Sequence, residues 1–227
     1  MLLLWNYFVL SFSALLPLIN PLGSALIFLG LVGQAPIPVY HSLARRIAIN
    51  TVLFLVAIDL AGATLLRFFG ISLPIVQVAG GLVISAIAWR LLNQESTDLT
   101  PEKMQAASQI HPGDLAEDLR QKIFYPFTFP ITAGPGCIVV MLTLAAHTPQ
   151  RPIKDNLLAH AGLLIAILVL CLSVYFCYAH AHRIAVSISP STAHGVLRVI
   201  AFILLCIGVQ IAWNGLVPLL TSVLHPH

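Results

Sequence analysis

Apolar residues form long runs along the chain, and charged residues mark where most of these runs end. No Asp, Glu, Lys or Arg occurs before Arg45, and Pro17, Asn20 and Pro21 interrupt this first stretch. The further apolar runs cover residues 47–66, 71–89, 123–150, 156–182 and 199–220. Because a transmembrane helix needs about 20 apolar residues, the pattern predicts six membrane-spanning helices.

The composition supports an all-α integral membrane protein. Of the 227 residues, 59% are hydrophobic and only 8% are charged, whereas a soluble domain averages about 25% charged residues. Too little polar surface remains to cover a water-soluble core. This excludes a soluble enzyme and a disordered regulator, and the net charge of +3 is too small to indicate a nucleic-acid partner.

One polar segment divides the chain. Residues 93–122 contain six of the eight acidic residues, together with the helix breakers Pro101, Pro112 and Gly113. The sequence therefore predicts a first three-span repeat over residues 1–92, a polar linker over 93–122 and a second three-span repeat over 123–227.

The distribution of basic residues predicts the orientation, because Lys and Arg collect on the cytoplasmic side of a membrane. With the N-terminus outside, the outer side receives three of the eleven, namely Arg67, Arg151 and Lys154. The inner side receives the other eight, namely Arg45, Arg46, Arg90, Lys103, Arg120, Lys122, Arg183 and Arg198. Both termini are therefore expected in the periplasm and the central linker in the cytoplasm.

A shift of about 113 residues aligns the two halves of the chain. Pro17 then falls on Pro130 and Gly23 on Gly136. Each half has three predicted spans, and an odd number places the second half upside down relative to the first. Inverted repeats are typical of secondary transporters. A duplication that serves stability alone is the alternative.

Two Pro/Gly breaks occupy matching places in the halves. Proline removes a backbone donor and glycine permits unusual backbone angles, so the first helix of each repeat should unwind or re-enter. Helix N-termini at Pro21 and Pro135 would attract a small anion or carboxylate. One such break alone would favour a purely structural kink, whereas two in register favour a binding site. The predicted substrate-binding residues are Asn20, Pro21, Gly23, Ser24, Thr132, Ala133, Gly134, Pro135 and Gly136.

These breaks carry a resemblance to a known family. Segments 19–23, 69–81 and 125–136, followed by Arg198 and later Gln210 with Asn214, stand in the order of the MarC family of bacterial inner-membrane proteins. That family is also described as the six-span neutral amino acid transporter family. The resemblance implies an inner-membrane permease for small neutral amino acids.

The chain departs from the family pattern at three positions. Ser24 replaces a frequent Asn, Gln77 a frequent basic residue, and Ala201 a frequent Gly. The change at Gln77 leaves the substrate preference open.

Several polar and small residues inside the spans are further candidates. Asp59 is the one carboxylate within a predicted span, and its cost in a bilayer makes it a candidate for coupling H⁺ or Na⁺, unless it faces water at a helix end. The supporting polar or close-packing residues are Gln77, Gly80, Gly81, Arg198, Gln210 and Asn214. Interhelical hydrogen bonds and close packing are the usual roles of such residues.

The chain shows no H-E-x-x-H, Gly-x-Ser-x-Gly or P-loop motif, so we expect no enzyme, no catalytic residue, no metal and no cofactor apart from a coupling ion. The expected partners are membrane lipid and a small-molecule substrate, but no nucleic acid, and a homo-oligomer is left open. The sequence predicts a secondary transporter that binds its substrate at the midplane. A structural or accessory membrane protein, or a channel or exporter of another metabolite, is the alternative.

Overall fold

The computed structural model describes residues 2–33, 35–93, 121–146, 153–187 and 190–224. The regular structure of these residues is entirely helical, which confirms the all-α class. The elements are α1 (Leu2–Ile19), α2 (Pro21–Val32), α3 (Ile37–Phe68), α4 (Leu73–Leu92), η1 (Ile123–Thr132), α7 (Pro135–Ala146), α8 (Ile153–Ala179), α9 (Ala181–Ser187) and α10 (Pro190–Leu224). Most of the predicted 93–122 linker lies outside the described residues.

Four segments of the described chain have the length and composition of membrane spans. They are Leu2–Val32, Leu73–Leu92, Lys154–Ala179 and Arg198–Ser222, and η1 with α7, bent by 69° at their junction, brings the number to five at most. Helix α3 contains the predicted 47–66 span and is 32 residues long, but it is not among these segments. The sixth span therefore stays a prediction.

The first break lies at Asn20, between α1 and α2. Asn20 adopts a left-handed conformation (φ 42°, ψ 69°), and its side-chain oxygen accepts a hydrogen bond from the amide of Gly23. Asparagine tolerates this conformation better than most residues. Pro21 is the first helical residue of α2, a position where its missing N–H costs nothing.

The second break is longer and irregular. Within η1, Tyr125 and Phe129 have extended backbone angles, as expected for residues that precede proline. The backbone bonds here are wider than those of an α-helix. The amide of Ala133, for example, donates to the carbonyl of Thr128, five residues back. Helix α7 then begins at Pro135, so the helices that follow the two breaks, α2 and α7, start at the prolines that the sequence indicates.

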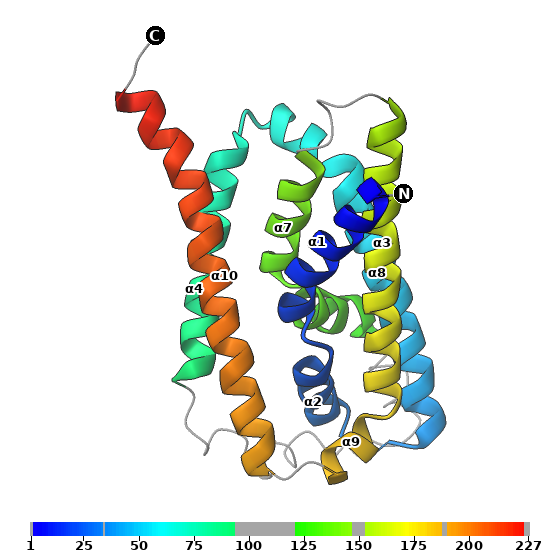
Figure 1. The fold of residues 1–227 in the computed structure, drawn as a ribbon. Coiled ribbons are helices and arrows are strands. Elements are labelled where there is room, and N and C mark those ends of the chain that lie inside the picture. The colour runs from blue at the N-terminus through cyan, green and yellow to red at the C-terminus, as the bar shows by residue number, and fades with distance from the viewer. Residues whose placement is uncertain (1, 34, 94–120, 147–152, 188–189, 225–227) are drawn as a thin grey trace.

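The helices form two groups (Figure 1). Helices α1, α2, α3, η1, α7, α8 and α9 enclose the larger core, with α3 and α8 side by side at one edge. Helices α4 and α10 lie together at the opposite edge and have a small core of their own from Ile84, Ala88 and Leu204. Helix α7 stands between the groups and contacts both α3 and α4.

Glycines permit the close approach of α4 and α10. A Cβ atom at Gly81 would lie 2.4 Å from the amide nitrogen of Ala212, and one at Gly215 would lie 2.4 Å from the carbonyl oxygen of Pro74. A Cβ atom at Gly80 would instead meet Val139 of α7 at 2.1 Å. Small residues at helix contacts are typical of packing in membranes, where van der Waals contact replaces the hydrophobic effect.

Candidate functional site

The hydroxyl of Tyr178 on α8 joins the two broken segments. It lies 2.8 Å from the Oγ1 atom of Thr132 in η1, and it also interacts with the side chain of Ser24 in α2. All three side chains are buried. Residues from the two halves of the sequence, more than 100 positions apart, therefore meet at one point.

Each hydroxyl beside Tyr178 also has a bond within its own segment. Ser24 donates to the carbonyl oxygen of Asn20 at 2.9 Å, and Thr132 donates to that of Phe127 at 2.7 Å. Both bonds run back to the preceding turn, and the carbonyl oxygen of Asn20 also accepts from the amide of Ser24. Ser24 and Thr132 therefore add side-chain bonds at the two breaks, and Tyr178 links the breaks to each other.

Aromatic rings close the space around this junction. The ring of Phe28 stacks on Tyr178 with 4.5 Å between centroids, and it meets Phe127 edge-on at 5.4 Å. Phe28, Phe127 and Tyr178 are fully buried. The junction is therefore packed shut in this conformation, and a ligand can enter only after these rings move.

The predicted substrate-binding residues occupy this region in different ways. Ser24 and Thr132 are brought together through Tyr178, and Gly136 faces Leu18 of α1 and Ile84 of α4. The others are placed at the breaks as backbone or capping residues, namely Asn20, Pro21, Gly23, Ala133, Gly134 and Pro135.

The helix starts carry few unused donors. Asn20 occupies the amides of Gly23 and Ser24, and the carbonyl of Gly134 accepts from Cys137 and Ile138. Proline contributes no N–H at either start. In the described chain, one first-turn amide at each start, that of Leu22 and that of Gly136, keeps no protein acceptor.

Replacing Asn20 with alanine should destabilise the protein by about 2 kcal/mol and lower Tm by about 4–8 °C. The change removes the cap on Gly23 and leaves a residue that disfavours the left-handed conformation. Asn20→Gly loses the same cap but accepts the conformation, so it should cost only a few tenths of a kcal/mol. Thermal unfolding of the purified protein measures the stability of both variants. Equal losses of stability would show that the left-handed conformation at position 20 does not disfavour alanine.

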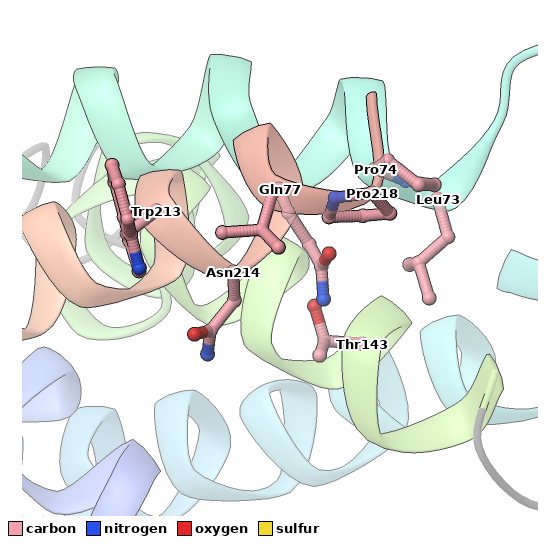
Figure 2. A pocket seen from close by; sticks show the side chains of 8 residues that line it. Leu73, Pro74, Gln77, Thr143, Trp213, Asn214 and Pro218 are labelled. Atoms are coloured by element: carbon pink, nitrogen blue, oxygen red, sulfur yellow. The ribbon is translucent and has the colours of Figure 1, made fainter. Parts of the chain in front are cut away.

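A second polar site lies between α4, α7 and α10. It is a pocket of about 490 Å³ lined by Leu73, Pro74, Gln77, Thr143, Trp213, Asn214, Val217 and Pro218. Figure 2 shows the amide of Gln77 and the hydroxyl of Thr143 pointing toward each other across it. Its amides, hydroxyl and indole suit a small neutral molecule that both donates and accepts hydrogen bonds.

The sequence anticipates part of this pocket. Gln77 is only 7% exposed, and Gln210 donates to Asn214 at 2.8 Å on the pocket's α10 side. Thr143 and Trp213 were not expected there. Neither has a sequence signal of its own, because a lone Thr or Trp in an apolar helix is common at any face.

A third polar contact pairs Asp59 of α3 with His160 of α8. The Nδ1 atom of His160 lies 2.8 Å from the Oδ2 atom of Asp59. Asp59 is a candidate from the sequence, whereas His160 is not, because its position beside Asp59 depends on the packing of α3 against α8. The remaining Oδ1 atom of Asp59 is buried and has no hydrogen-bond partner in the described chain.

The other candidates lie apart from these sites. Arg198 is exposed on α10, and Gly80 and Gly81 serve helix contacts, as described above. Among the described residues, no group of three or more His, Cys, Asp or Glu side chains could hold a metal ion.

Comparison with known proteins places the chain among relatives of similar length. Residues 5–220 match the family described as MarC family integral membrane protein. The "UPF0056 inner membrane protein MarC" of Salmonella typhimurium is 27% identical over 218 residues, covering 94% of this chain and 95% of that protein. The protein of the same name from Escherichia coli O1:K1 is 28% identical over 216 residues, with the same coverage. No solved structure matches the chain.

Proposed function

Because the chain belongs to the MarC family of integral membrane proteins, we propose that it is a secondary transporter of small neutral amino acids or similar metabolites. The observation that carries the proposal is the meeting of Ser24 and Thr132 at Tyr178. Broken helices that converge inside a membrane protein are a common way to build a substrate site, because their backbone groups must face protein or water.

The directions of the helices support two inverted three-span repeats. In Figure 1, α3 rises while α8 descends beside it, and α4 descends while α10 rises. The broken segment of α1 and α2 descends, whereas α7 rises after its break. Each proposed pair is therefore antiparallel, as an inversion requires. Two such halves can exchange conformations and open the site to opposite sides in turn.

The chemistry at the breaks favours a neutral or zwitterionic ligand. The free amides of Leu22 and Gly136 would meet a carboxylate at two helix starts, and Ser24 and Thr132 would add neutral hydrogen bonds. The nearest described elements of the junction, α2, η1 and α7, contain no charged side chain. In the closed conformation Tyr178 takes the place that the ligand would occupy.

The proposed orientation places both termini in the periplasm and the central linker in the cytoplasm of the inner membrane. The last turn of α4, which contains Arg90, and helix α9, which contains Arg183, lie toward the bottom of Figure 1. The last turn of α3, which contains Arg67, lies toward the top (Figure 1). This separation supports the excess of basic residues on the cytoplasmic side.

Uptake into proteoliposomes tests the proposal directly. The purified full-length protein should accumulate at least one small neutral amino acid under a proton or sodium gradient, and it should catalyse saturable counterflow of that solute. Flux without saturation or counterflow would indicate a channel instead. No flux of any neutral amino acid under either gradient would contradict the proposal and favour an accessory membrane protein.

A further inference from the structure

The pair of Asp59 and His160 lies where the second helices of the two proposed repeats meet. Asp59 is 9% exposed and His160 is 30% exposed, so the carboxyl group is enclosed while the imidazole has an accessible side. Their 2.8 Å contact accounts for only one of the two carboxyl oxygens. The Oδ1 atom of Asp59 remains buried without a donor in the described chain.

A buried carboxylate oxygen without a donor is costly, and it is more costly in a medium of low dielectric constant. If neutral His160 donates to ionised Asp59, the pair carries one negative charge with one unsatisfied oxygen. One additional proton removes the charge and turns the empty acceptor into a hydroxyl donor. The geometry therefore provides a place for one exchangeable proton.

Asn156 supplies a second unused acceptor nearby along α8. Its Oδ1 atom is also buried without a partner in the described residues. Asn156 lies four residues before His160, which puts both side chains on the same face of the helix. A hydroxyl donor formed on Asp59 would thus find unused acceptor capacity on the neighbouring turn.

We propose that Asp59 and His160 form the proton-binding site that couples transport to the proton gradient. This assignment rests on the proposed transport function and names its coupling ion. The site takes one proton from the side on which His160 is accessible and releases one proton after the conformational change. A hard metal cation is less suited to the site, because such ions require more oxygen ligands than this group offers.

The charged and titratable groups around the pair are few. Helix α8 contributes Lys154 and Asp155 in its first turn, and α3 contributes Arg67 two turns beyond Asp59. Among the packed neighbours, α1 contributes Tyr7, η1 contributes Tyr125, and α7 contributes only Cys137. Among the described residues of α3 and α8, the one other carboxylate is therefore Asp155, in the first turn of α8.

Helix α8 connects the proton site to the closed junction at Tyr178. It is continuous from Ile153 to Ala179, so His160 and Tyr178 lie about 27 Å apart on one rigid element. Protonation changes the strength of the α3–α8 contact at one end, and Tyr178 holds the broken helices at the other. A tilt of α8 would affect both contacts together.

Two measurements on the full-length protein in proteoliposomes test the assignment. The first is solute uptake driven by a proton gradient, compared with counterflow without a gradient. Asp59→Asn should reduce driven accumulation at least tenfold and leave counterflow within about twofold, while Asp59→Glu should restore part of the accumulation. Asp155→Asn, a carboxyl change on the same helix pair, should alter neither. Accumulation that Asp59→Asn leaves intact, or that a sodium gradient alone drives, would overturn the proposal.

The second measurement does not depend on transport. Infrared difference spectra across a pH titration should show the C=O stretch of a protonated carboxylic acid that disappears in Asp59→Asn and persists in Asp155→Asn. His160→Gln should displace the pH at which that band appears. A protein without measurable flux would fail the transport proposal but still show this band. A spectrum in which no titrating band depends on Asp59 would overturn the proton site even if transport is found.

Discussion

Replacing Gly81 with leucine is expected to force α4 and α10 apart and to destabilise the protein by about 3 kcal/mol, which lowers Tm by roughly 6–12 °C. A Cβ atom at this position would lie 2.4 Å from the amide nitrogen of Ala212 and 2.5 Å from the carbonyl oxygen of Gly208. Both neighbours are backbone atoms, which no side-chain rotation can move away. The helices themselves must therefore separate.

Gly195 provides the matched control for this change. It lies on α10, is exposed, and a Cβ atom there would meet nothing within 4 Å. Gly195→Leu should therefore leave Tm within about 2 °C of the parent protein. Thermal unfolding in detergent, followed by tryptophan fluorescence, compares the two variants. A Gly81→Leu protein as stable as Gly195→Leu would contradict the close packing of α4 and α10.

The sequence predicts the breaks well because their cause is local. Proline disfavours a helical conformation at the residue before it and suits the first turn of a helix, so Pro21 and Pro135 indicate the starts of α2 and α7. The membrane class is equally secure, since 59% apolar residues leave no soluble alternative. The extended residues Tyr125 and Phe129 are explained by the same rule.

The side-chain partners could not be predicted, because they depend on which helices become neighbours. Tyr175 and Tyr178 lie in the same apolar run, and nothing in the sequence distinguishes them. Only the packing of α8 against its neighbours places Tyr178, and not Tyr175, beside Thr132. His160 is likewise one of nine histidines in the sequence, and only the packing of α3 beside α8 shows that it is the partner of Asp59. Spacing within a helix gives its faces, but it does not say which neighbour each face will meet.

The capping role of Asn20 also changes the picture of the substrate site. From sequence, Asn20 and Ser24 are free hydrogen-bonding groups beside a helix start. In the structure the Asn20 side chain accepts from Gly23, and Ser24 donates to the backbone of Asn20. A ligand at α2 must therefore replace existing bonds, which favours a site that forms during opening rather than one that stands ready.

Tyr178→Ala is expected to destabilise the protein by about 3–5 kcal/mol and to lower Tm by roughly 6–20 °C. The side chain is fully buried and stacks on Phe28 at 4.5 Å. Its removal leaves a void among Phe28, Phe127 and Thr132. These side chains then lose their contacts with the Tyr178 ring, because neighbouring rings refill such a space only in part. Phe176→Ala, which truncates an exposed aromatic residue on the same helix, should lower Tm by no more than about 2 °C.

Tyr178→Phe separates the hydroxyl from the ring. The stack on Phe28 remains, and Ser24 and Thr132 keep their bonds to Asn20 and Phe127, so stability should fall by only about 1 kcal/mol. The connection between the halves is nevertheless lost, so the closed junction should open more often. Labelling of buried Cys137 by a maleimide, with the other three cysteines replaced by serine, should then be about 2–10-fold faster than in the parent. An unchanged labelling rate would show that the aromatic packing alone keeps the junction closed and that the hydroxyl contributes nothing to its closure.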